Sequence, residues 1–268
     1  MSLKQNPPSR GRHVTVNGVR LHYVQIGQGR PPLVLLPGIT SPAATWEFVA
    51  QRLAAACDVF VLDHRGRGLS QGGEDLGYTL DNYAADTQAL IERLGLDRPD
   101  ILGHSMGARI AVRLAARYPK NVGRLLLVDP PVSGPGRRPY PIPLDFYLES
   151  LAQVSRGEGL EEMKQRFNWT EQQIETRMQW LPSCDPAAIK GSHASFQEED
   201  MHADLPSITA RTLLIYAEHG DTVRDEDAQE IVQGLGGQAD KVRIAGAGHM
   251  IPWDRLDDFV ETVTAFLQ

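Results

Sequence analysis

The sequence has few cysteines, no apolar stretch of membrane-spanning length and no excess of positive charge. Its two cysteines, Cys57 and Cys184, lie far apart, which gives neither a disulfide framework nor the spacing of a zinc site. No apolar run approaches the roughly 18 residues of a membrane helix. The net charge of −7 disfavours nucleic acids and anionic membranes as partners, because both would repel the chain.

Residues 1–12 also lack the apolar stretch of a secretory signal peptide. We therefore expect a cytoplasmic protein. What the chain does have is an ordinary globular composition, with 41% hydrophobic and 23% charged residues. A length of 268 residues suits one catalytic domain that carries an inserted subdomain.

Short apolar runs that end in turn residues predict the strands of a largely parallel sheet. Two alternating runs around Asn17-Gly18 predict an N-terminal hairpin. Buried strands are then expected at residues 33–36, 59–62, 101–102, 125–128, 212–216 and 242–244. Helical patterns lie between them at residues 46–56, 80–94, 108–118 and 256–267. This alternation predicts a doubly wound α/β fold.

The alternation of strands and helices breaks between Pro130 and Pro206. A proline-rich stretch comes first, and helical patterns follow at residues 144–156, 160–167, 171–180 and 186–195. A helical insert between two parallel strands lies over the carboxyl edge of the sheet, where open α/β sheets bind ligands. We expect residues 131–205 to form a helical cap, inserted after the sixth strand into a core of residues 1–130 and 206–268.

A G-x-S-x-G pattern, Gly103-His104-Ser105-Met106-Gly107, lies between an expected strand and an expected helix. A serine on such a sharp strand-to-helix turn is pushed outward, at the positive end of the helix. The serine hydroxyl holds its proton too tightly to react at neutral pH, so a nucleophilic serine needs a base beside it. Ser105 is therefore the candidate nucleophile.

His249 is the candidate base, because it follows the last expected strand in a glycine-rich loop. A third group must orient the imidazole and stabilise its charged form. Asp129 ends the strand at 125–128, and Asp221 follows the strand at 212–216. Either aspartate gives the chain order Ser, Asp, His, and the residues alone do not choose between them.

Hydrolysis at a carbonyl also requires two N–H groups that stabilise the oxyanion. Met106, directly after the candidate nucleophile, is expected to supply one through its backbone. The loop after the strand at 33–36 is expected to supply the other, and Ile39 is the candidate there.

Three features together resemble the α/β-hydrolase superfamily. They are Pro37-Gly38 after the first core strand, Asp-His-Arg-Gly-Arg-Gly-Leu-Ser at 63–70, and the nucleophile pattern at 103–107. Pro37 stands where relatives usually have histidine, which leaves the backbone donor of the loop in place. The resemblance implies an α/β-hydrolase fold with a helical cap.

The segment at 128–140, together with the spacing of Ser105, Asp129 and His249, resembles the N-formylmaleamate deamidases of nicotinate degradation. This resemblance implies hydrolysis of a small carboxylated amide to maleamate and formate, through an acyl-enzyme on Ser105. It also favours Asp129 over Asp221 as the triad acid. The implied mechanism needs no cofactor and no metal.

A small anionic amide as substrate requires a bidentate arginine for its carboxylate and aromatic walls for its planar group. We expect these contacts from the cap and rank the first two arginines highest. The candidates are Arg137, Arg138, Tyr140, Arg166, Trp169 and Trp180.

Two other functions are compatible with the same motifs. A carboxylesterase or a carbon–carbon bond hydrolase of a ring-cleavage pathway uses the same nucleophile turn and the same fold. A ligand-binding protein built on this scaffold would retain the fold without hydrolysis. Turnover of a substrate panel separates the enzymes, and a fluorophosphonate adduct on Ser105 separates an enzyme from a binding protein.

Overall fold

The computed structural model describes residues 7–236 and 239–268, and a single eight-stranded sheet forms its centre. The strand order is β1-β2-β4-β3-β5-β6-β7-β8. The strands are β1 Ser9–Val16, β2 Val19–Ile26, β3 Pro32–Leu36, β4 Asp58–Asp63, β5 Asp100–His104, β6 Leu125–Val128, β7 Thr212–Ala217 and β8 Ala239–Ile244. β2 pairs antiparallel with β1 and β4, and the other pairs are parallel. The predicted hairpin and the mostly parallel sheet are confirmed.

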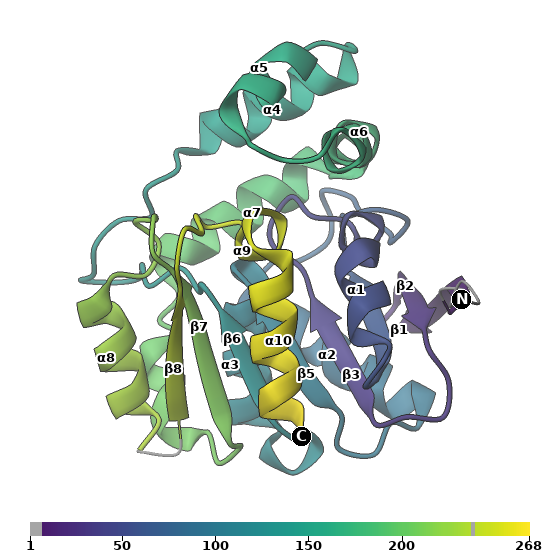
Figure 1. Ribbon diagram of the computed structural model, residues 1–268. Coiled ribbons are helices and arrows are strands. Elements are labelled where there is room, and N and C mark those ends of the chain that lie inside the picture. The colour runs from purple at the N-terminus through teal and green to yellow at the C-terminus, as the bar shows by residue number, and fades with distance from the viewer. Residues whose placement is uncertain (1–6, 237–238) are drawn as a thin grey trace, which may run out of the picture.

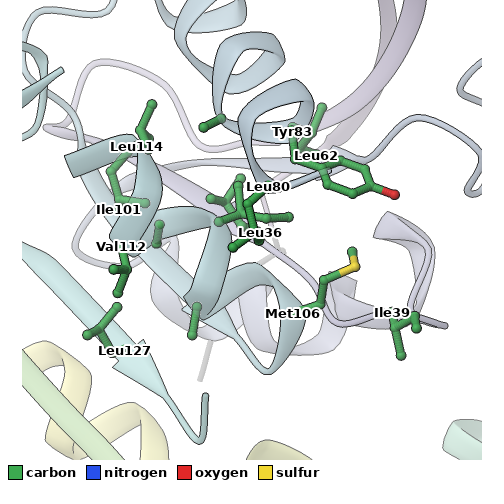
Figure 2. Packing of buried hydrophobic residues seen from close by; sticks show 14 of the residues in the cluster. Leu36, Ile39, Leu62, Leu80, Tyr83, Ile101, Met106, Val112, Leu114 and Leu127 are labelled. Atoms are coloured by element: carbon green, nitrogen blue, oxygen red, sulfur yellow. The ribbon is translucent and has the colours of Figure 1, made fainter. Parts of the chain in front are cut away.

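Helices cover both faces of the sheet, as the doubly wound prediction requires (Figure 1). Those of the core are α1 Glu47–Leu53, α2 Leu80–Leu94, α3 Met106–Arg117, α8 Asp225–Gly234, α9 Ile251–Asp254 and α10 Leu256–Leu267. Successive side chains of a strand point to opposite faces of the sheet, so one strand contributes to the hydrophobic clusters on both faces. Leu33 and Leu35 of β3 join the cluster under α1 and α10, whereas Val34 and Leu36 join the cluster under α2, α3 and α8 (Figure 2).

Four helices lie between β6 and β7, where the sequence predicted a helical insert. They are α4 Leu144–Ser155, α5 Leu160–Arg166, α6 Glu171–Trp180 and α7 Pro186–Glu198. Figure 1 shows α4, α5 and α6 above the sheet, with α7 between them and the core. Short 3₁₀ helices lie at Ala43–Trp46, Pro119–Asn121, Leu181–Ser183 and His202–Ser207. The domain boundaries at 130 and 206 stay predictions.

The structure differs from the sequence expectations at several element ends. Helix α3 begins at Met106, two residues earlier than expected, because the helix starts directly after the serine of the turn. Helix α1 ends at Leu53 rather than at residue 56. Helices α8 and α9 were not predicted, although the acidic first turn of α8, from Asp225 to Asp227, suits the positive end of a helix.

The described residues hold neither a membrane-spanning helix nor a cluster of metal ligands. No helix within 7–236 and 239–268 is long and apolar enough to cross a membrane. In the same ranges, no group of three or more His, Cys, Asp or Glu side chains is arranged to hold a metal ion. The cytoplasmic location stays a prediction.

Candidate active site

Ser105 occupies a strained turn between β5 and α3. Its φ of 55° and ψ of −119° lie in a region that residues with a side chain rarely adopt. Both glycines of the pattern are required by close contacts. A Cβ on Gly103 would lie 2.2 Å from the carbonyl oxygen of Gly107, and a Cβ on Gly107 would lie 1.8 Å from that of Leu36. The sequence therefore permits a turn that no larger residue could make at these two positions.

A chain of hydrogen bonds joins the serine to a histidine and an aspartate. His249 Nε2 lies 3.0 Å from Ser105 Oγ, and His249 Nδ1 lies 2.6 Å from Asp129 Oδ2. Asp129 is fully buried directly after β6, and its Oδ1 accepts the Ala217 N–H at 3.2 Å. This geometry allows His249 to take the serine proton while the carboxylate fixes the ring orientation and stabilises the imidazolium.

The structure brings Asp129, and not Asp221, to His249. Asp221 lies in the loop after β7 with its side chain 55% exposed, and it pairs with Arg224 at 2.7 Å. The hydrogen bond from Arg224 lowers the pKa of Asp221. The sequence alone did not decide which aspartate is the triad acid, because both follow neighbouring strands of the sheet.

The two expected oxyanion donors come from two segments that meet at the serine. Met106 is the first residue of α3, where a helix N–H has no acceptor within the helix. Ile39 is buried in the loop after β3, and this loop abuts the serine, since a Cβ on Gly38 would lie 3.4 Å from Ser105 Cβ. Figure 2 shows the Met106 and Ile39 side chains at the same end of the hydrophobic cluster.

His104 contacts the loop that carries His249. Its Nε2 donates to the carbonyl oxygen of His249 at 2.9 Å, and the two ring centroids are 4.9 Å apart. Burial lowers the pKa of His104 to about 3. The ring is therefore neutral at physiological pH and adds no second positive charge when His249 becomes protonated.

A cavity of about 280 Å³ opens above Ser105, between the sheet and the cap. Three of the expected substrate contacts line it: Tyr140, Arg166 and Trp169. Trp169 is held in place by a hydrogen bond from its Nε1 to Asp254 Oδ1 at 3.0 Å and by stacking on Phe167. The cavity wall is mostly apolar and aromatic, as small-molecule sites usually are.

The other three expected contacts lie outside this cavity. Arg137 pairs with Glu230 of α8, and Arg138 pairs with Asp227 at 2.5 Å. Trp180 lines a second cavity on the other side of α6. The two arginines that the sequence ranked highest are therefore engaged by carboxylates of α8, a helix that the sequence analysis did not predict.

Arg177 and Tyr147 are among the cavity residues that the sequence analysis missed. Arg177 of α6 donates to the Thr40 carbonyl at 2.6 Å and to Thr40 Oγ1 at 2.7 Å, and none of the ion pairs among the described residues includes it. Tyr147 shares a 2.6 Å hydrogen bond with the hydroxyl of Tyr140. A signal for Arg177 was present, because it follows the buried Ile174 by three residues and so shares its helix face.

Comparison with known proteins identifies the family. Residues 31–256 match the family model of the alpha/beta hydrolase fold. An N-formylmaleamate deformylase of Pseudomonas putida is 45% identical over 258 residues, which is 96% of each chain. The crystal structure of an N-formylmaleamic acid deformylase from Pseudomonas putida is also 45% identical, with a TM-score of 0.90, covering 95% of this chain and 100% of that one.

A more distant relative is a 2-hydroxy-6-oxononadienedioate/2-hydroxy-6-oxononatrienedioate hydrolase of Pseudomonas putida. It is 27% identical over 267 residues, which cover 93% of this chain and 92% of the relative. With the sheet, the serine turn and the family match in agreement, the chain belongs to the alpha/beta hydrolase fold family.

Proposed function

We propose that this protein hydrolyses N-formylmaleamate to maleamate and formate, with Ser105 as nucleophile, His249 as base and Asp129 as the acid that orients it. One observation carries the proposal: a hydrogen-bonded Ser, His and Asp set opens into a small cavity that also holds Arg177, an arginine with no carboxylate partner in the part of the chain that the structure describes. The relative of 45% identity, whose name is N-formylmaleamate deformylase, supports the choice of substrate.

The reaction uses the chain's own groups at each step. Ser105 Oγ attacks the formyl carbon while His249 takes its proton, and the N–H groups of Ile39 and Met106 stabilise the oxyanion. His249 then protonates the nitrogen, the C–N bond breaks and maleamate leaves. Water then gives a proton to His249 and attacks the formyl-enzyme. The bond to Ser105 Oγ breaks, formate leaves, and His249 returns the proton to Ser105.

Arg177 is our candidate for the substrate carboxylate, in place of Arg137 and Arg138. It lines the cavity and has no carboxylate partner among the described residues. Arg166 also lines the cavity, but its guanidinium lies 4.4 Å from the ring centroid of Phe146 and its side chain faces solvent. The planar amide would lie against the aromatic wall that includes Trp169.

Formate release from N-formylmaleamate, measured for the wild type and for Ser105→Ala, tests the proposal. We expect rapid release that is lost in the variant, together with a fluorophosphonate adduct on Ser105 of the wild type. No release, with turnover of an aryl ester or of a dienoate ketone, would replace the amide substrate by those of the alternative hydrolases. An inert Ser105 would favour the binding protein.

A further inference from the structure

A buried arginine contacts both residues of the proposed oxyanion hole. Arg67 belongs to the loop after β4 and is 1% exposed. Its Nε donates to the Ile39 carbonyl at 3.0 Å, and its Nη2 lies 3.8 Å from Met106 Sδ. One guanidinium thus touches both residues that supply the proposed oxyanion donors, although the loop after β3 and the start of α3 are far apart in the sequence.

The remaining contacts of Arg67 are also to uncharged atoms. It donates to the Ser192 hydroxyl at 2.8 Å and to the Ala188 carbonyl at 3.2 Å, both on α7, to the hydroxyl of Tyr83 and to the Arg65 carbonyl at 3.0 Å. No ion pair within residues 7–236 and 239–268 includes Arg67, in contrast to its neighbour Arg65, which pairs with a carboxylate. Among the described residues, the cation is therefore hydrogen-bonded by neutral groups and not by a carboxylate.

A buried charge without a counter-ion costs stability even when it is hydrogen-bonded, so its position relative to the reaction is informative. In the proposed reaction, an anion does form in this region, on the carbonyl oxygen of the tetrahedral intermediate. A fixed positive charge behind that oxygen needs no reorganisation when the anion appears, which is how preorganised sites stabilise a transition state. The guanidinium of Arg67 would also fix the backbone of Ile39 relative to α3.

We propose that Arg67 is a positioning residue for the oxyanion hole, which holds the Ile39 loop against the start of α3 and places an uncompensated positive charge behind the oxyanion. The inference rests on the proposed function of Ser105. It predicts that Arg67 acts on the transition state and not on substrate binding, because no part of the Arg67 side chain lines the cavity.

Arg109 of α3 provides a matched control. It is also fully buried, and it donates only to carbonyl oxygens, at Pro131, Ser133, Ser195 and Glu199. It shares with Arg67 the role of holding α7 to the core, but it touches neither Ile39 nor Met106. Arg67→Met and Arg109→Met should therefore both lower the thermal unfolding midpoint, while only the former should impair the oxyanion hole.

The test uses hydrolysis of p-nitrophenyl acetate and inhibition by an alkyl boronic acid, whose boron bonds to the serine oxygen and becomes a tetrahedral anion. We expect Arg67→Met to lower kcat by about 10–100-fold, less than the full loss of an oxyanion donor. KM should stay near the wild-type value, and boronate affinity should fall by a similar factor. Arg109→Met should retain most of the wild-type kcat and boronate affinity.

Arg67→Lys keeps the charge but lacks the fork, so its loss should lie between the wild type and Arg67→Met. If Arg67→Met does not fold, wild-type kcat and boronate affinity in Arg67→Lys overturn the inference. Equal losses in the two Met variants also overturn it, because Arg67 would then act only on the fold. A Ser105→Ala variant that retains esterase activity would instead refute the proposed nucleophile.

Discussion

Replacing Arg177 by methionine tests how the substrate is recognised. An arginine has five N–H donors, and Thr40 engages two of those of Arg177. Three donors therefore remain, which is enough for a bidentate pair with a carboxylate. A hydrogen bond to a charged group contributes about 1.5–3 kcal/mol net. Loss of this pair should raise the KM for N-formylmaleamate by about 10–100-fold, at about 1.4 kcal/mol for each factor of ten.

The assay compares initial rates of formate release from N-formylmaleamate and from its uncharged methyl ester. The ester lacks the anion, so its KM should be similar in the wild type and in Arg177→Met. Arg177→Lys retains a charge without the planar fork and should give an intermediate KM for the acid. Arg166→Met removes the more exposed cavity arginine and should raise this KM less.

A second control separates recognition from loop support. Thr40→Val removes the Oγ1 acceptor of Arg177 but leaves the guanidinium in the cavity. We expect it to retain the preference of the wild type for the acid over the ester. If Arg177→Met raised KM equally for the acid and the ester, the reasoning would be refuted, because Arg177 would then act by supporting the loop at Thr40 and not by binding the carboxylate.

The remaining predictions concern the triad, the turn and pH. Asp129→Asn should lower kcat by about 10⁴-fold because the wrong tautomer of the histidine is favoured, while steady-state rates of Asp221→Asn should stay near wild type. Gly107→Ala should give no folded protein by circular dichroism, because its Cβ would lie 1.8 Å from the Leu36 carbonyl oxygen. Burial lowers the pKa of His104 to about 3, whereas an unfolded histidine titrates near about 6.5. The unfolded chain therefore gains a proton first as the pH falls, so the stability present above about pH 6.5 decreases by up to about 1.4 kcal/mol per unit towards the lower value. Burial also lowers the pKa of His64 to about 3 and that of His202 to about 4. Urea unfolding of the wild type should therefore show a combined slope at least this steep, and His104→Asn should show a shallower one.

The features that the sequence predicts well are those that depend on neighbouring residues. The serine turn needs small residues two positions before and after Ser105. Gly103 and Gly107 therefore predict the turn from the local sequence alone. Helix α2 was expected at its observed bounds. In the structure, Thr79 caps it through Asn82, and Gly95 ends it in a left-handed conformation. These signals depend on neighbouring residues and not on how distant segments pack.

The features that the sequence does not settle depend on contacts between distant segments. Asp129 and Asp221 both follow parallel strands, and only the packing of the two loops decides which carboxylate reaches His249. The same holds for Arg137 and Arg138, whose carboxylate partners on α8 lie 93 and 89 residues further along the chain. A prediction that counts arginines near the start of the cap cannot detect such neutralisation.

An arginine's own partners, and not the net charge of the chain, decide how strongly it can attract a further anion. The chain carries a net charge of −7, yet its cavity and the region behind Ser105 hold Arg177 and Arg67, which within the described ranges bond only to uncharged groups. A guanidinium that already faces a carboxylate gains little from a second anion, whereas one held by carbonyl and hydroxyl oxygens retains its full charge. Arg177 would then meet the charge that the substrate brings, and Arg67 the charge that the reaction creates.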